Sequence, residues 1–100
     1  MHKNTITPIA QLLAQAGSTH HRFEQTVLNG IYDEAWPDWY AGHLLEHNLN
    51  DLLAQPVNQT ELSRFLFHSN QVRKQHHPEP NWVEYTARDI ITRFANLPQR

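Results

Sequence analysis

Apolar residues recur at intervals of three and four along most of this 100-residue chain, and this spacing places them on one face of an α-helix. A first helix is expected to start at Thr7-Pro8, because proline suits the first helical position, and to end at Gly17. A second helix is expected from Ser18 or Thr19 to the stop signal Asn29-Gly30. The two apolar stripes consist of Ile9, Leu12, Leu13 and Ala16, and of Phe23, Val27, Leu28 and Ile31.

Three further helices are predicted in the rest of the chain. One begins between Asp33 and Pro37 and runs to about Asn48, and it is followed by a connection over residues 50–57 with a short helical turn. The other two begin where an asparagine precedes a glutamate by three residues, at 58–61 and 81–84, a spacing that resembles a capping box. The inward-facing residues are Trp36, Trp39, Tyr40, His43, Leu44 and His47; Leu62, Phe65, Leu66 and Val72; and Trp82, Val83, Ala87, Ile90, Ile91, Phe94 and Leu97.

The predicted fold is therefore all-α, a compact bundle of four to five short helices that forms a single domain over residues 1–100. A composition of 39% apolar and 18% charged residues suits a domain that folds by itself. Three glycines leave no Gly-rich phosphate loop. The absence of internal repeats and of sustained heptads argues against solenoids and coiled coils.

The charge balance and the missing cysteines narrow the possible partners. Eight Lys and Arg against ten Asp and Glu give a net charge of −2, which disfavours binding to nucleic acid or to an anionic membrane. Without cysteine there are no disulfides, no thiolate nucleophiles and no Cys-ligated zinc. No signal-peptide core and no run of about 18 apolar residues is found. We therefore expect a cytoplasmic protein.

The segment from His43 to His47 reads H-x-x-E-H, and two histidines four residues apart can bind one divalent metal from the same helix face. The motif resembles that of the inverzincin metallopeptidases. This resemblance implies that His43 and His47 are ligands, that Glu46 is the general base and that a later helix supplies a third ligand. A zinc or other divalent-metal site could also be completed by a second subunit or by one of His68, His76, His77 and Glu84, and His21 with Glu24 forms another possible pair. The alternative is that both histidines of the motif are half-buried packing residues.

A second group of candidate residues combines aromatic rings with acids. Residues 31–51 contain five carboxylates and no Lys or Arg, together with two of the three tryptophans and two of the three tyrosines. Such a group can form a box for an amine or another cation, or anchor a protein interface. Helix capping by the acids and core packing by the rings is the alternative. The predicted ligand or partner surface consists of Tyr32, Asp33, Trp36, Asp38, Trp39 and Tyr40.

The run Val27-Leu28-Asn29-Gly30-Ile31-Tyr32-Asp33, followed by Trp36-Pro37-Asp38-Trp39-Tyr40-Ala41, resembles a segment of a family of small uncharacterised bacterial helical proteins. The resemblance covers about a fifth of the chain. It implies a bacterial helical domain, and it assigns no activity and no catalytic residue.

The leading functional hypothesis is a small soluble helical module for interaction or ligand binding. In this module Trp36, Trp39 and Tyr40 pack against the last helix or against a partner, which is a second copy of the chain or another protein. No catalytic serine is assigned, because no serine lies in a G-x-S-x-G or S-x-x-K pattern. No other catalytic residue and no cofactor is assigned in this leading hypothesis. The runner-up is a divalent-metal-binding protein that uses His43 and His47, with metal-dependent hydrolysis as one form. A response to pH through the eight histidines is a third hypothesis.

Overall fold

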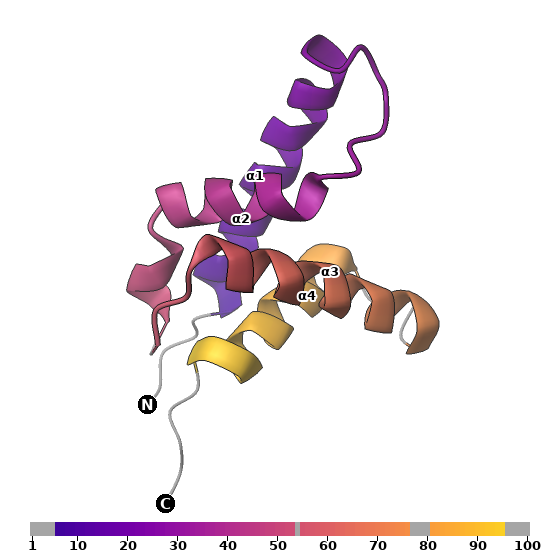
Figure 1. Ribbon diagram of the computed structural model, residues 1–100. Coiled ribbons are helices and arrows are strands. Elements are labelled where there is room, and N and C mark those ends of the chain that lie inside the picture. Colours follow the sequence, from indigo (N-terminus) through magenta and orange to yellow (C-terminus); the bar gives the residue numbers. More distant parts are fainter. Residues whose placement is uncertain (1–5, 54, 77–80, 96–100) are drawn as a thin grey trace, which may run out of the picture.

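The computed structural model describes residues 6–53, 55–76 and 81–95. Within these residues the chain forms four α-helices, α1 (Ile6–Thr26), α2 (Trp36–Glu46), α3 (Gln59–His76) and α4 (Trp82–Ile90). A 3-10 helix, η1 (Leu49–Leu52), follows α2, and a π-helical segment, η2 (Ile91–Ala95), continues α4 (Figure 1). Because the described residues contain no β-strand, the predicted all-α fold is confirmed.

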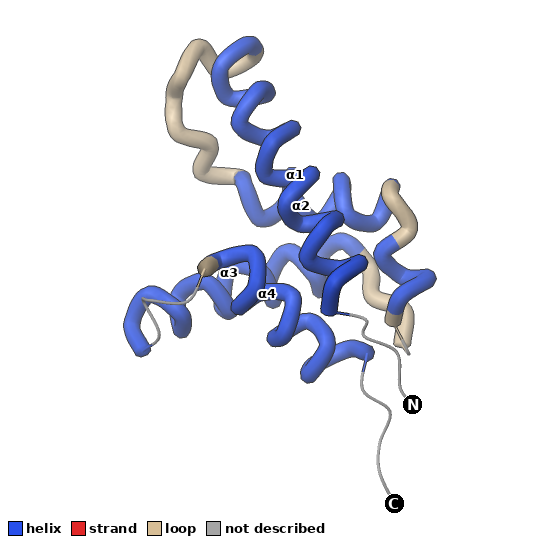
Figure 2. Tube along the Cα trace, turned by 180° about the vertical axis from the view of Figure 1, so that it is seen from behind, coloured by secondary structure: helices blue, strands red, loops and turns tan. Residues whose placement is uncertain are grey.

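The helices are arranged around α1 and α2, which cross one another. The element α2 packs on α3, α1 packs on both α4 and α2, and α3 packs on α4. Figures 1 and 2 show that the C-terminal half of α1 projects beyond the other helices, and that the loop over residues 27–35 runs back along it to α2. This projecting half and its loop form one side of the site described below.

The core is made by small and branched apolar side chains from every α-helix. Burial of these side chains removes apolar surface from water, which is the main force that holds the bundle together. Most of the predicted inward-facing positions are confirmed, although Leu97 lies outside the described residues. The buried apolar residues are Ile9, Leu13, Ala16, Ala41, Leu44, Leu49, Val57, Leu62, Leu66, Ala87, Ile90 and Phe94.

The two predicted asparagine caps are confirmed. The Asn58 Oδ1 atom accepts a hydrogen bond of 2.8 Å from the backbone N–H of Glu61, at the start of α3. The Asn81 Oδ1 atom accepts from the N–H groups of Val83 and Glu84, at 2.8 and 3.3 Å. Each cap gives partners to N–H groups that the first helical turn cannot satisfy, so it defines where the helix begins.

The predicted helix break at Gly17 is wrong, because α1 continues through this residue to Thr26. A glycine inside a helix costs only about 1 kcal/mol relative to alanine, and the packing of α1 against its neighbours outweighs this cost. The predicted stop at Asn29-Gly30 is confirmed. Both residues have positive φ angles, 55° and 81°, and the Gly30 N–H closes the helix end by donating to the carbonyl of Glu24 at 2.7 Å.

The predicted apolar stripe of the second helix is also wrong at its C-terminal end. Val27 and Ile31 lie beyond the end of α1, and they are 61% and 68% exposed. Once the helix has stopped, the spacing of three and four no longer directs side chains to one face.

No described helix is long and apolar enough to span a lipid bilayer.

Replacing Gly17 by alanine is expected to stabilise the fold. A Cβ atom at this position would lie 3.5 Å from the Tyr40 Oη atom, which is an ordinary van der Waals distance. We expect Gly17→Ala to raise the free energy of unfolding by about 0.5–1 kcal/mol in urea denaturation. Gly30→Ala is the matched control, because its φ of +81° makes alanine unfavourable by about 1–2 kcal/mol. A loss of stability in Gly17→Ala would contradict the close but unstrained packing of α1 on Tyr40.

Candidate functional site

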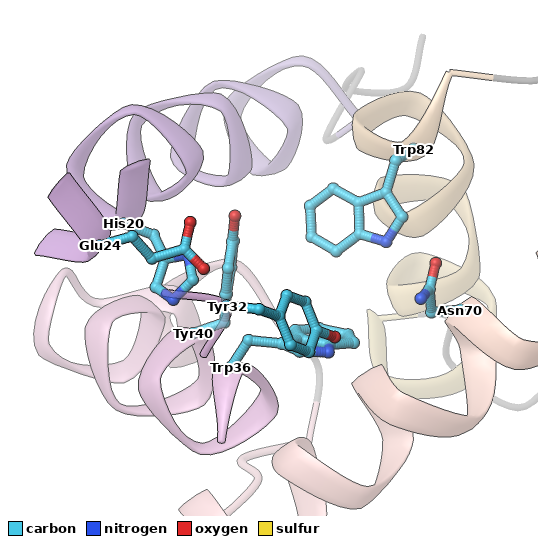
Figure 3. Close-up of a pocket in the computed structure, with 7 residues that line it drawn as sticks. All are labelled: His20, Glu24, Tyr32, Trp36, Tyr40, Asn70 and Trp82. Carbon is cyan, nitrogen blue, oxygen red and sulfur yellow. The ribbon is translucent and has the colours of Figure 1, made fainter. Parts of the chain in front are cut away.

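A pocket of about 310 Å³ lies where the projecting half of α1 meets the starts of α2 and α4. Its walls come from four helices and from the loop over residues 27–35, so it forms only when distant parts of the chain have come together. Figure 3 shows the lining side chains around a shared space. The residues that line it are His20, Glu24, Tyr32, Trp36, Tyr40, Asn70 and Trp82.

Aromatic rings from two helices form the main walls. Trp36 and Tyr40 are four residues apart in α2 and therefore lie on the same face, one turn apart. Their ring centroids are 5.7 Å apart with an interplanar angle of 90°. Trp82, the first residue of α4, stands at 80° to Trp36 and at 69° to Tyr40, with centroid distances of 6.2 and 5.3 Å. The Asn81 cap fixes this end of α4, so it also positions the Trp82 ring.

The charge in the pocket comes from Glu24. Its Oε2 atom accepts a hydrogen bond of 3.2 Å from the backbone N–H of Asp33, which joins α1 to the loop. Burial, followed by the negative charge of Glu24, raises the pKa of the Tyr40 hydroxyl above its ordinary value of 10.0. The hydroxyl therefore stays protonated at physiological pH. The described lining residues include no Lys or Arg that could neutralise Glu24.

A buried hydrogen bond between His20 and Asp33 supports the pocket. The His20 Nε2 atom lies 2.8 Å from the Asp33 Oδ2 atom, and the two side chains are 8% and 12% exposed. The other carboxylate oxygen of Asp33 accepts from the N–H of Ala35 at 3.0 Å, in the turn that leads into α2. The His20 ring also packs against Trp39 and Tyr40. Asp33 thus connects α1, the loop and the start of α2.

The structure brings three of the six predicted surface residues into the pocket, Tyr32, Trp36 and Tyr40. Asp33 lies next to it and bonds His20. Asp38 instead connects α2 to α3, since its carboxylate accepts from the Ser63 hydroxyl at 2.6 Å. Trp39 does not line the pocket, although its ring contacts the lining residues His20 and Tyr40. It also packs on Phe23 and His43.

Sequence reasoning missed His20, Glu24, Asn70 and Trp82 as lining residues. His20 and Glu24 are four residues apart in α1, so helical spacing alone could have paired them. The sequence analysis instead predicts a possible metal-binding pair of His21 and Glu24. Trp82 was predicted as a core residue. Its contact with Trp36 and Tyr40 confirms one predicted possibility, that the α2 rings pack against the last helix.

The H-x-x-E-H motif lies on α2, outside the aromatic pocket. The rings of His43 and His47 stack face to face, with centroids 4.1 Å apart and an angle of 24°, and the His47 Nδ1–H donates to the His43 carbonyl at 2.9 Å. Trp39 stacks on the other face of His43 at 5.0 Å. The contacts that the structure shows for these two rings are therefore stacking contacts with each other and with Trp39.

A third metal ligand is also missing from the described part of the chain. There, no group of three His, Asp or Glu side chains could hold a metal ion, so neither Glu46, His68, His76 nor Glu84 completes a site with the two motif histidines. The pair of His21 and Glu24 gains no third ligand either. His77 lies outside the described residues. The geometry of these residues therefore favours packing for His43, which is stacked on Trp39 and His47, whereas His47 itself is exposed.

Stability should depend on pH through His43. Burial, and then the neighbouring His47, lower the pKa of His43 from its ordinary value of 6.5, and the opposing effect of Glu46 is smaller. Below pH 6.5 the unfolded chain therefore binds more protons at His43 than the folded chain does. The free energy of unfolding should fall as pH decreases through this value. In urea denaturation, the free energy of unfolding of His43→Gln should fall less between pH 8 and pH 5 than that of the parent protein. An equal or larger fall would contradict the lowered pKa of His43.

Comparison with known proteins finds no match to this chain among protein families, curated proteins or solved structures. The resemblance of residues 27–41 to a family of bacterial helical proteins therefore stays a prediction. The residues that line the pocket are therefore the basis for a functional proposal.

Proposed function

We propose that this protein is a small ligand-binding module whose pocket between α1, α2 and α4 binds a small organic cation. The observation that carries the proposal is the combination of the Tyr32, Trp36, Tyr40 and Trp82 rings with the Glu24 carboxylate, in a lining whose described residues include no Lys or Arg. Three of these rings, Tyr32, Trp36 and Tyr40, belong to the segment where the sequence allows an amine box or an interface anchor, whereas Glu24 and Trp82 lie outside that segment. As a cytoplasmic module, a location that its cysteine-free composition favours, it would meet the ligand in a reducing compartment.

The physical basis is the charge distribution of aromatic rings. Each ring has a negative face, so a cation near several faces is attracted by all of them, by about 0.5–2 kcal/mol for each favourable contact. The Glu24 carboxylate adds direct charge attraction. A pocket of about 310 Å³ lies at the lower end of the range for small-molecule sites, which indicates a ligand of few heavy atoms.

The walls are held in place before a ligand arrives. Trp36, Tyr40 and Trp82 contact one another, and Asp33 ties the loop to α1 through both His20 and Glu24. A site of this kind loses little conformational entropy on binding, because its side chains are already ordered. Tyr32 differs from the other rings, since it is 68% exposed.

Binding to a second copy or to another protein stays a prediction. The exposed apolar side chains Val27, Ile31 and Tyr32 belong to the loop beside the pocket, and Phe67 on α3 is 50% exposed. Scattered apolar side chains of this kind are common on protein surfaces. They favour an interface less directly than the pocket favours a ligand.

We expect cations, and not anions of similar size, to bind the pocket. In a ¹H–¹⁵N NMR titration with choline, ethanolamine and acetate, at least one of the two cations should shift the indole N–H signals of Trp36 and Trp82 more than that of Trp39. Because the chain contains three tryptophans, the Trp39 signal is an internal reference. Acetate should produce no such shift.

Removing the charge of Glu24 should weaken this binding. Glu24→Gln keeps the shape of the side chain, and we expect it to raise the Kd of the bound cation about fivefold or more, as expected for the loss of one nearby charge. Glu34→Gln is the matched control, because Glu34 is an exposed acid of the same loop that does not line the pocket. Failure of both cations to shift any indole signal, or equal affinities of the two variants, would contradict the proposed function.

A further inference from the structure

We propose that the cation is a fully methylated ammonium group, carried by a small molecule. This inference rests on the proposed function and concerns the class of ligand that the same pocket selects. Its basis is the contrast between the many ring faces and the few available hydrogen-bond acceptors. A primary ammonium has three N–H donors that need acceptors, whereas a fully methylated ammonium has none.

Three polar atoms of the pocket already have partners in the protein. Glu24 Oε2 accepts from the backbone of Asp33, and His20 Nε2 is bonded to the Asp33 carboxylate. The Asn70 Oδ1 atom accepts from an Arg73 guanidinium N–H at 3.3 Å. A primary ammonium that leaves water for this pocket has to find acceptors for three N–H groups among the Glu24 Oε1 atom and the Tyr32 and Tyr40 hydroxyls, and each unmatched donor is costly.

The ring arrangement suits a group that needs contact on several sides. The interplanar angles among Trp36, Tyr40 and Trp82 are 90°, 80° and 69°, so the rings face in three clearly different directions. Figure 3 shows them around the space between α1, α2 and α4. A tetrahedral methylated ammonium spreads its positive charge over its methyl groups, and these can touch rings in different directions at once. Such a group is also weakly hydrated, so little is lost when water leaves.

Tyr32 supplies a further wall that a ligand would cover. Its ring is 68% exposed although it lines the pocket, and its backbone lies next to Asp33, the residue that holds the loop against α1. An exposed ring beside a bound cation gains both burial and cation–π attraction. Tyr32 is also the ring that can be removed with little risk to the core.

The test compares three probes that share a two-carbon alcohol, on the full chain. Choline carries a trimethylammonium group, ethanolamine carries the unmethylated amine on the same two-carbon alcohol, and 3,3-dimethylbutan-1-ol replaces the charged nitrogen of choline by carbon. We expect choline to bind at least about tenfold more tightly than either of the other two, as judged from the indole N–H signals of Trp36 and Trp82. Ethanolamine binding as tightly as choline would overturn the inference and leave the proposed function intact. Equal binding of the neutral alcohol would overturn both, and so would the absence of binding by both cations.

Variants at two exposed rings separate a ligand contact from a structural role. Tyr32→Ala should raise the Kd for choline about fivefold while the free energy of unfolding changes little, because the ring lies largely in solvent. Phe67→Ala is the matched control, since Phe67 is an exposed ring on α3 that does not line the pocket. If Tyr32→Ala binds choline as tightly as the parent protein does, with choline still the tightest of the three probes, Tyr32 does not contact the ligand. Equal losses in both variants would overturn the location of the site.

Discussion

The buried hydrogen bond between His20 and Asp33 is the contact on which the rest of the site depends. It joins the C-terminal half of α1 to the loop, beside the bond from the Asp33 N–H to Glu24, and it does so with a polar pair that is almost fully shielded from water. Leaving either partner alone would expose an unsatisfied polar group to a low-dielectric surrounding, so the two side chains are strongly coupled. The loop in turn sets where Tyr32 lies and how the chain enters α2.

The rings of the pocket have two roles, and this combination constrains what the site can do. Trp36, Tyr40 and Trp82 are partly buried against the core, so they help to hold α2 and α4 together. The same three rings also line the pocket. A site made from such rings is rigid, which favours selectivity for the shape and charge of a ligand over large movements on binding. Beside these rings, His20 and Glu24 each bond Asp33.

Local features of the fold could be predicted from the sequence, and non-local ones could not. The caps at Asn58 and Asn81 and the helix stop at Asn29-Gly30 were predicted because each depends on a few neighbouring residues. The break at Gly17 was wrong because tertiary packing outweighed a small local preference. The aromatic and acidic segment was recognised as a candidate site. Its partners Glu24 and Trp82 were missed because only the packing of α1 and α4 on α2 brings them there.

The position of Trp82 at the first turn of α4 has a consequence for how the protein acquires its site. The walls extend from His20 to Trp82, so a chain that emerges from the ribosome must have released all residues up to Trp82 before the pocket exists. Loop closure over this many residues is also a late and slow event compared with the formation of the separate helices. Ligand occupancy would therefore mark a fully assembled molecule, and partly folded chains would be left without a bound ligand.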